Sequence, residues 1–239
     1  MIRLDKFLSE LNICSRSEAS KRVKAGQVKI NGETAKAADV KINEGLDIVM
    51  FCDRQIVYEK FVYFMLNKPE GYVSATKDNH DKTVIDLFSG ENFKGLFPVG
   101  RLDKDTTGLL IITNDGELGH RLTGPKFEVY KEYLATLSLK LSEDAVKKLE
   151  NGVDIGEGKL TKPCRVKKID DKTILISICE GKFHQVKRML KAVNNEVLTL
   201  KRLSMGNVFL DKELKPGEYR RLTSDEISIL KGLSEVIDA

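Results

Sequence analysis

Residues 100–118 read GRLDKDTTGLLIITNDGEL and carry the clearest fold signals in the chain. The apolar run LLIIT predicts a buried strand, and a polar loop between two glycines leads into it. Asn114, with Glu117 three residues later, predicts that a helix follows the strand. The Asp115-Gly116 pair instead favours a hairpin turn at the same place. We expect the helix, and therefore a fold that mixes strands and helices without strict alternation.

The polar loop at residues 100–108 has more than one interpretation. Polar groups in such loops often serve function, although Asp and Thr side chains in a turn also bond to their own backbone. No Gly-Lys-Ser or Gly-Lys-Thr run follows, so a phosphate-binding P-loop is excluded. Asp103 and Asp105 could share a metal ion, but the segment offers no further ligands for one.

A second cluster, EGKFHQVKRM at residues 180–189, predicts a helix. Its buried face is defined by apolar residues at helical spacing: Val186, Met189, Leu190 and Val193. Lys187 borders that face, where a lysine can extend along a cleft while its stem stays packed. Residues 178–202 hold six cations against two acids, which suits phosphate contact, although an ordinary solvated helix surface explains the charges as well.

These two clusters, together with KEYLATL at residues 131–137, resemble motifs of the pseudouridine synthases, in the branch of the RsuA family. YFMLNKPEGYVS at residues 63–74 and LKPGEYRRLT at residues 214–223 also match, and all the motifs follow the family's order. The resemblance implies an α+β catalytic domain built on a mixed, mainly antiparallel sheet.

The resemblance also assigns roles to individual residues. It makes Asp103 the essential carboxylate, Lys187 its charge partner and Tyr133 the ring that stacks on the target uracil. Arg101 is implied to help hold the RNA with its base flipped out. We expect further RNA contacts from the third motif: Lys182, His184, Gln185 and Arg188. Isomerisation has no redox step, so we expect neither a cofactor nor a metal ion.

The chemistry of uridine isomerisation fits these roles. An ionised Asp103 could attack the sugar, as a glycosidase carboxylate does, or remove a sugar proton, and both possibilities stay open. A buried carboxylate without a partner costs several kcal/mol or becomes protonated. We therefore expect Lys187 to preserve the charge of Asp103.

The N-terminal segment predicts a small, basic module. Apolar residues at helical spacing from Leu4 to Leu11 predict one helix, and Ser15 with Glu18 predicts the start of a second that Gly26 ends. Residues 28–32 then predict a strand running into an Asn-Gly hairpin turn, and residues 46–50 predict a further strand. This stretch resembles the S4 RNA-binding domain. Its expected RNA-binding residues are Arg3, Lys6, Arg16, Lys21, Arg22 and Lys24.

We therefore predict two domains, an S4 domain at residues 1–55 and a catalytic domain at residues 61–239, with a linker near residues 52–60. Within the second domain, residues 61–66 predict a strand, and Ser142 is expected to cap a helix that ends at Asn151-Gly152. A last helix is expected to begin at Thr223 and to bury Ile227, Leu230 and Leu233.

The composition excludes several classes of protein. With 239 residues, 41% of them hydrophobic, and a net charge of +4, the chain is neither a disulfide-stapled mini-protein nor a disordered polycation. Its four cysteines are too far apart to suggest a zinc site and indicate reduced thiols in the cytoplasm. No apolar run is long enough to span a bilayer.

The expected activity is isomerisation of uridine in small-subunit (16S) ribosomal RNA within an assembling subunit, with uridine 516 as the target and the protein acting as a monomer. LTKP at residues 160–163 favours this branch over the alternative, a large-subunit (23S) enzyme. A non-catalytic RNA-binding factor for ribosome assembly and a glycosidase acting on free sugars are the rivals from other classes.

Overall fold

The computed structural model describes residues 1–56, 59–91 and 93–233. The chain forms two compact units. The first comprises Met1–Val62 with Ser89–Leu96, and the second comprises Tyr63–Phe88 with Phe97–Ala239. Each unit has its own hydrophobic core, and each is described separately below.

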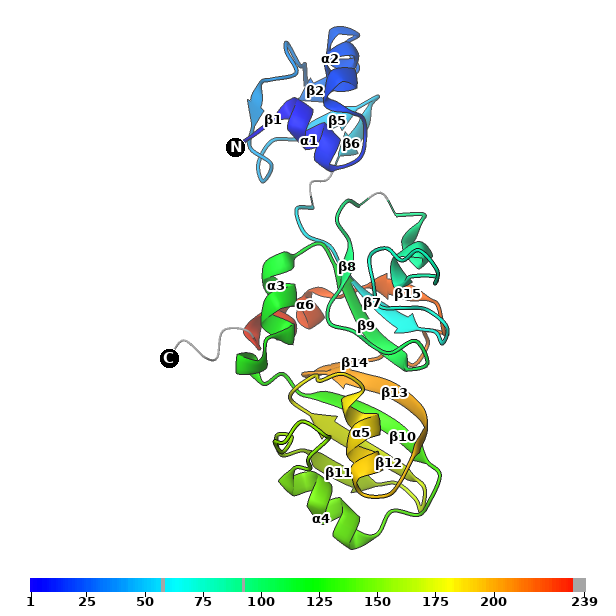
Figure 1. Ribbon diagram of the computed structural model, residues 1–239. Helices are drawn as coiled ribbons and strands as arrows, with labels where there is room; N and C mark the ends of the chain where they lie inside the picture. The colour runs from blue at the N-terminus through cyan, green and yellow to red at the C-terminus, as the bar shows by residue number, and fades with distance from the viewer. Residues whose placement is uncertain (57–58, 92, 234–239) are drawn as a thin grey trace. The chain divides into compact units, whose positions relative to one another are not determined.

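The first unit pairs two short helices with small antiparallel sheets (Figure 1). Its elements are β1 (Ile2–Arg3), α1 (Leu4–Glu10), α2 (Arg16–Lys24), β2 (Val28–Ile30), β3 (Glu33–Thr34), β4 (Lys41–Ile42), β5 (Val49–Phe51) and β6 (Arg54–Ile56). Leu4, Phe7 and Leu8 of α1 are buried against Ala19 and Val23 of α2. The predicted pair of helices is therefore confirmed, and their apolar faces form the core of the unit.

Local signals explain where these elements begin and end. The Ser15 hydroxyl accepts a hydrogen bond from the Glu18 amide at 3.3 Å, as expected for a helix cap, and Gly26 ends the helical segment with φ +70°. Asn31 and Gly32 have φ values of 51° and 87°, which a hairpin turn of this type requires. The predicted hairpin between β2 and β3 is thus confirmed.

Two predictions for this unit need correction. The strand expected at residues 46–50 begins only at Val49, because the Asp47 carboxylate accepts bonds from Asn31 and from the Asn43 amide and so holds the preceding residues in a turn. The linker expected at residues 52–60 is wrong in its first half. Residues 52 and 53 form a turn, and β6 returns to pair with β5. Residues 57 and 58 of the expected linker lie outside the described residues.

The second unit is built on one sheet of nine strands. Its elements are β7 (Tyr63–Lys68), η1 (Val84–Phe88), β8 (Phe97–Pro98), β9 (Thr107–Thr113), α3 (Gly116–Thr123), η2 (Pro125–Phe127), β10 (Lys131–Leu137), α4 (Glu143–Asn151), β11 (Arg165–Lys168), β12 (Thr173–Ile178), α5 (Gln185–Ala192), β13 (Val197–Met205), β14 (Val208–Phe209), β15 (Tyr219–Arg221) and α6 (Ser224–Gly232).

The main strands follow the order β11-β12-β10-β13-β9-β7-β15, with β14 beside β13 and β8 beside β9. Every named pair is antiparallel except β9 with β13, which run parallel over two residues. The predicted α+β fold with a mixed, mainly antiparallel sheet is confirmed. Figure 1 shows α3 and α6 next to each other beside this sheet, and they are in contact.

Caps fix the helices of this unit. A helix does follow β9, as predicted, but its cap is Asp115, which accepts a bond from the Leu118 amide at 3.1 Å. The Asp115 carboxylate also accepts a bond from the Tyr63 hydroxyl at 2.7 Å. Ser142 caps α4, and Thr223 with Glu226 forms a complete capping box on α6, both as predicted. Leu230 is fully buried, whereas Ile227 and Leu233 are only partly buried.

A glycine sets the spacing between the two strands that run parallel. Gly108 has φ +98°, and a Cβ atom at this position would overlap the backbone carbonyl of Arg202. Only glycine allows β9 to approach β13 this closely. The close approach places the start of β9, and the polar loop before it, next to the middle of β13.

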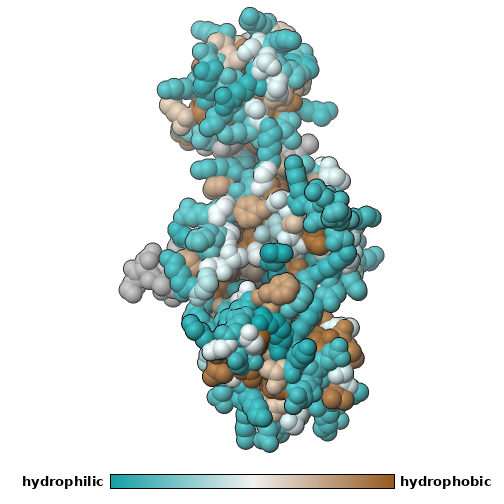
Figure 2. All heavy atoms as spheres, viewed as in Figure 1, coloured by the Kyte–Doolittle hydropathy of each residue, from teal (hydrophilic) through white to brown (hydrophobic). Residues whose placement is uncertain are grey.

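The face of the second unit that Figure 2 shows is mainly hydrophilic. Figure 2 shows hydrophilic residues over most of the visible face, with hydrophobic residues in small separate spots. None of the helices in the described residues is long and apolar enough to cross a membrane.

Candidate active site

The loop that precedes β9 is held at its first half by Ser74. The Ser74 hydroxyl donates to the Leu102 carbonyl at 2.9 Å and accepts from the Leu102 amide at 3.0 Å. Ser74 and Leu102 are both buried, at 7% and 6% exposed. Both backbone polar groups of the residue before Asp103 are thereby fixed.

Lys68 holds the second half of the same loop. It is the last residue of β7 and is fully buried, and its ammonium donates to three backbone carbonyls: Pro69 at 3.1 Å, Lys104 at 3.3 Å and Thr106 at 2.8 Å. Burial lowers the pKa of Lys68 to about 8, although the carboxylates of Asp105 and Asp103 act to raise it. A buried ammonium with three acceptors therefore ties the loop to the sheet.

Asp103 lies between the two anchors and faces α5. The Lys187 ammonium is 3.2 Å from the Asp103 carboxylate and 2.6 Å from that of Asp105. His184 Nε2 lies 3.5 Å from the other carboxylate oxygen of Asp103, Oδ1. The side chain of Asp103 is 25% exposed, against 63% for Asp105. The loop and the helix, 82 residues apart in sequence, thus meet at these carboxylates.

The pKa values of Asp105 and Lys187 are both shifted by this contact. The hydrogen bond from Lys187 lowers the pKa of Asp105, against the effect of desolvation. Desolvation acts to lower the pKa of Lys187, but its hydrogen bonds to Asp105 and Asp103 prevail and raise it. Lys187 is therefore a cation at neutral pH, and Asp105 is an anion.

Tyr133 lies on the wall of the cavity that opens beside Asp103. The cavity measures about 450 Å³, and its walls come from the polar loop, β10, β13 and the segment that leads into α5. Asp103, Tyr133 and His184 all contribute to its lining. Tyr133 is only 8% exposed. Buried and partly exposed residues alternate along β10, and Tyr133 is one of the buried ones. The three residues predicted to carry the chemistry therefore meet: Asp103 and Tyr133 line this cavity, and Lys187 pairs with Asp103.

The segment before α5 has an unusual backbone. His184, the N-cap of α5, has φ +49°, a left-handed conformation that is uncommon for a residue other than glycine. Its ring stacks on Phe183, with the ring centroids 3.8 Å apart. Phe183 is 73% exposed and lines the cavity, so an exposed aromatic ring stands at the edge of the site.

The other predicted RNA-binding residues of this unit fall into two groups: some line the cavity, and others are bonded within the protein. Arg101 is exposed and lines the cavity, and Lys182 lines it while pairing with Glu157 at 3.1 Å. Gln185 is buried, and its side-chain amide bonds to Glu180 at 2.6 Å. Arg188 donates to the Ile155 and Phe183 carbonyls and to Glu157. Through these bonds Gln185 and Arg188 help to hold the segment that leads into α5.

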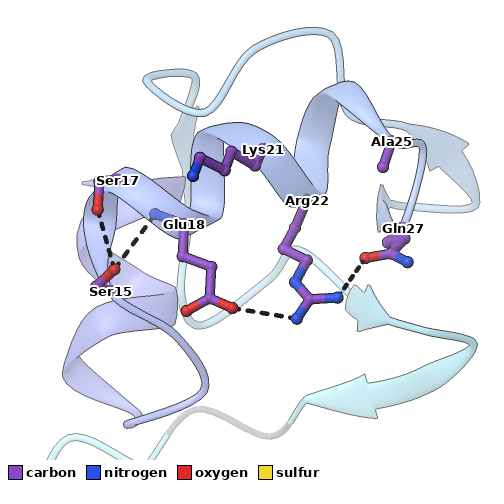
Figure 3. A pocket seen from close by; sticks show the side chains of 7 residues that line it. All are labelled: Ser15, Ser17, Glu18, Lys21, Arg22, Ala25 and Gln27. Atoms are coloured by element: carbon purple, nitrogen blue, oxygen red, sulfur yellow. Dashed lines mark hydrogen bonds and ion pairs between the residues drawn. The ribbon is translucent and has the colours of Figure 1, made fainter.

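The predicted cations of the first unit lie on its surface. Arg16, Lys21 and Lys24 are exposed, and Lys21 and Arg22 line a hollow of about 510 Å³ along α2 (Figure 3). Several of the cations are paired: Arg3 with Asp5 at 2.8 Å, Lys6 with Glu10 at 3.5 Å and Arg22 with Glu18 at 3.1 Å. Figure 3 shows the Arg22 guanidinium between Glu18 and Gln27, while Lys21 reaches away from them.

Sequence reasoning missed Lys68 and Ser74 as individual residues of the site. Both lie in YFMLNKPEGYVS, which matched a family motif without any residue being singled out. A lysine at the end of an apolar strand was the available signal for Lys68, because a cation there must find acceptors. Among the described residues, no group of histidine, cysteine, aspartate and glutamate side chains is arranged to hold a metal ion.

Comparison with models of protein families matches residues 62–192 to RNA pseudouridylate synthase. Residues 2–48 match the S4 domain. The first match covers the polar loop, Tyr133 and α5, and the second covers the two N-terminal helices.

Relatives are similar over almost their whole length. The chain is 46% identical to an RNA pseudouridine synthase of Bacillus subtilis named YtzG, covering 96% of this chain and 98% of that protein. It is 41% identical to ribosomal small subunit pseudouridine synthase A of Yersinia pestis, over 95% and 97% of the two chains, and 38% identical to the Escherichia coli protein of the same name, over 95% and 99%. A crystal structure of a pseudouridylate synthase superposes with a TM-score of 0.69 at 40% identity, covering 96% of this chain and all of that one.

Proposed function

This chain belongs to the RNA pseudouridylate synthase family and carries an S4 domain, and from this we propose that it isomerises one uridine of small-subunit (16S) ribosomal RNA to pseudouridine. Membership in the family makes the protein an isomerase. The proposed target is uridine 516, presented in an assembling small subunit to a monomeric enzyme. The observation that carries the proposal is that Asp103 and Tyr133 line one cavity while Lys187 pairs with Asp103 at 3.2 Å.

The choice of the small subunit rests on the relatives. Proteins 38–41% identical to this chain over nearly full length bear the name ribosomal small subunit pseudouridine synthase A. Residues 1–55 would hold the RNA through the exposed cations of α2, and residues 61–239 would perform the reaction. A large-subunit enzyme is the alternative within the same family.

Asp103 is proposed to act at the sugar of the target nucleotide. Its backbone is held by the anchoring of Leu102 on one side and of Lys104 on the other. As a nucleophile it would attack C1′, and as a base it would remove a sugar proton; either step breaks the C1′–N1 bond. A rigid loop favours both, because a reacting group held in place loses little entropy on reaching the transition state.

Lys187 is proposed to keep Asp103 ionised once RNA covers the site. An RNA that fills the cavity removes water from Asp103, and desolvation by itself would favour the protonated carboxyl. The ammonium at 3.2 Å opposes this effect. Asp105 shares the ammonium, and its greater exposure leaves Asp103 as the carboxylate that faces the substrate.

Tyr133 is proposed to stack on the extruded uracil. Removing a base from its stack costs a few kcal/mol, and stacking on an aromatic ring returns about 1–3 kcal/mol. Arg101, exposed at the cavity, would contact the RNA backbone beside the extruded nucleotide. Phosphate contacts from both units would supply the remaining binding energy.

Tritium release tests this proposal. RNA made with 5-tritiated uridine loses tritium to water when C5 becomes bonded to the sugar. We expect wild-type protein to release one equivalent from small-subunit RNA, free or in a partly assembled particle, and Asp103→Asn to release none while binding the RNA equally well. Release only from large-subunit RNA would contradict the choice of subunit. Tight binding to RNA without release from any RNA would favour a binding factor, and turnover of free nucleosides would favour a glycosidase.

A further inference from the structure

Two buried cations on the cavity wall have no part in the chemistry described so far. Lys131 begins β10 and is 8% exposed, and Arg202 lies in β13 and is 2% exposed. Both line the cavity that Asp103 and Tyr133 share. Burying an ammonium and a guanidinium together is unfavourable unless negative charge compensates them.

The sheet places both cations beside Tyr133. Lys131 is two residues before Tyr133 on the same strand, so their side chains point to the same face of the sheet. Arg202 is the register partner of Tyr133 on β13. A ring that stacks on Tyr133 therefore lies next to these two positive charges.

The protein itself leaves this charge unbalanced. Arg202 Nε donates to the Leu109 carbonyl at 2.7 Å, but its Nη2 atom is buried without a hydrogen-bond partner. In the part of the chain that the structure describes, no carboxylate forms an ion pair with Lys131 or Arg202. Burial, and to a smaller extent the charge of Arg202, lowers the pKa of Lys131 to about 8. A negatively charged group of the substrate would compensate this positive charge.

We propose that Lys131, supported by Arg202, stabilises the uracil ring as an anion while it is detached from the sugar. The inference rests on the proposed function. When the C1′–N1 bond breaks, its electron pair stays on uracil, which becomes an anion. Meanwhile C1′ carries either a bond to the Asp103 carboxylate or, if Asp103 has taken the C2′ proton, a double bond to C2′. When C5 of the rotated ring bonds to C1′, the carboxylate leaves or the proton returns to C2′. C5 then loses its proton and N1 gains one, so atoms and charge balance. Fixed positive charge aimed at such an anion in a water-poor site lowers the barrier to its formation.

The alternative anion is a phosphate of the RNA backbone. The position of Lys131 favours the base, because Lys131 is buried and shares the face of Tyr133. Arg101, which is exposed, and Lys182, which is partly exposed, line the same cavity and are more accessible to a phosphate. A phosphate contact would contribute to affinity for RNA and to its salt dependence. An anion that exists only during the reaction contributes to the rate and not to affinity.

The test compares Lys131→Met with Lys131→Arg and with Lys167→Met, a control that removes an exposed lysine from β11. Tritium release is measured in a single turnover at saturating enzyme, and RNA affinity by filter binding. We expect Lys131→Met to lower the rate constant about 100-fold or more while its dissociation constant for RNA stays within about twofold and it unfolds at the same or a higher temperature. Lys131→Arg retains most of the rate, and Lys167→Met matches wild type.

The pH profile supplies a readout that a purely structural role would not move. The rate of wild-type protein is expected to fall above about pH 8, where Lys131 loses its charge, and the Lys131→Met profile should lack that step. The titratable and charged groups around Lys131 are Arg202 on β13 and Cys179 after β12, with Asp103, Glu180, Lys182 and His184 elsewhere on the lining.

Each outcome decides between the explanations. A Lys131→Met rate within about threefold of an active wild type overturns this inference and leaves the proposed function intact. Weakened RNA binding with an unchanged rate at saturation assigns Lys131 to a phosphate and also overturns it. Wild-type protein that releases tritium from no RNA overturns the proposed function and this inference together.

Discussion

The Lys187 ammonium lies 3.2 Å from Asp103 but is shared with Asp105, which it approaches to 2.6 Å. One cation thus serves two carboxylates that differ in exposure and in position relative to the cavity. Asp103 lines the cavity, and Asp105 points its carboxylate toward solvent. The shorter contact therefore belongs to the carboxylate that does not line the cavity.

This sharing predicts a contrast between two variants. Lys187→Met leaves Asp103 without its cation in a site that RNA desolvates, and we expect tritium release to fall at least about 100-fold. Asp105→Asn leaves Lys187 free to pair with Asp103 alone, and we expect activity within about threefold of wild type. Single-turnover tritium release measures both. Equal losses in the two variants would mean that Asp105 is as important to the reaction as Asp103.

Ser74 predicts a positioning effect. Ser74→Ala removes the only side-chain oxygen that bonds both backbone groups of Leu102 among the described contacts. Leaving two buried polar groups unpaired costs about 1–3 kcal/mol each, and the freed loop should lower the turnover rate more than it changes RNA affinity. Urea denaturation and single-turnover kinetics test the two effects. Ser228→Ala is the control, because the Ser228 hydroxyl bonds only its own exposed helix at Ser224.

Lys68 and Lys131 offer a matched pair of buried lysines with different surroundings. Both have a pKa lowered to about 8 by burial, but Lys68 donates to three backbone carbonyls of the loop. Lys68→Met should destabilise the protein by about 2 kcal/mol or more, because buried carbonyls lose their donor. Lys131→Met should cost little or should stabilise, because it removes a desolvated charge. Unfolding in urea at pH 7 compares them.

The lowered pKa of Lys131 also predicts how that comparison changes with pH. Between pH 8 and 10.5 the unfolded chain holds a proton on Lys131 that the folded protein has released, so the wild-type free energy of unfolding rises with pH through this group. Lys131→Met lacks this contribution. Its stability advantage over wild type should therefore shrink across that interval, by up to about 3 kcal/mol. An advantage that stays constant with pH would contradict the lowered pKa.

Local signals predicted most of the secondary structure, because they act through neighbouring residues. The caps at Ser142 and Thr223 and the Asn31-Gly32 turn depend only on residues within one turn of chain, and all three are confirmed. The linker prediction failed because the polar residues around Cys52 were interpreted as a boundary, when they form the turn of a hairpin. A polar stretch alone does not distinguish these two structures.

From the sequence, only those residues of the site could be predicted to which a family motif assigns a role. The motifs predict roles for Asp103, Tyr133 and Lys187 without showing that the three side chains lie close together. They did not indicate that Lys68 would be fully buried, or that Arg202 would keep an unpaired nitrogen, since both facts depend on contacts between strands far apart in sequence. The same limit applies to Gln185, whose side chain is engaged within its own loop.

Adding a single methyl group at Gly108 is expected to affect both stability and activity. A Cβ at this position would overlap the Arg202 carbonyl, and φ +98° is unfavourable for any other residue. Gly108→Ala must therefore push β9 away from β13, and we expect it to lower the free energy of unfolding by at least about 2 kcal/mol. Because the polar loop leads directly into β9, the folded variant should also lose much of its tritium release. The control is Gly116→Ala in the first turn of α3, where an added Cβ meets nothing within 4 Å and alanine favours the helix. If both variants were equally stable in urea, the close approach of the two strands would not constrain the site.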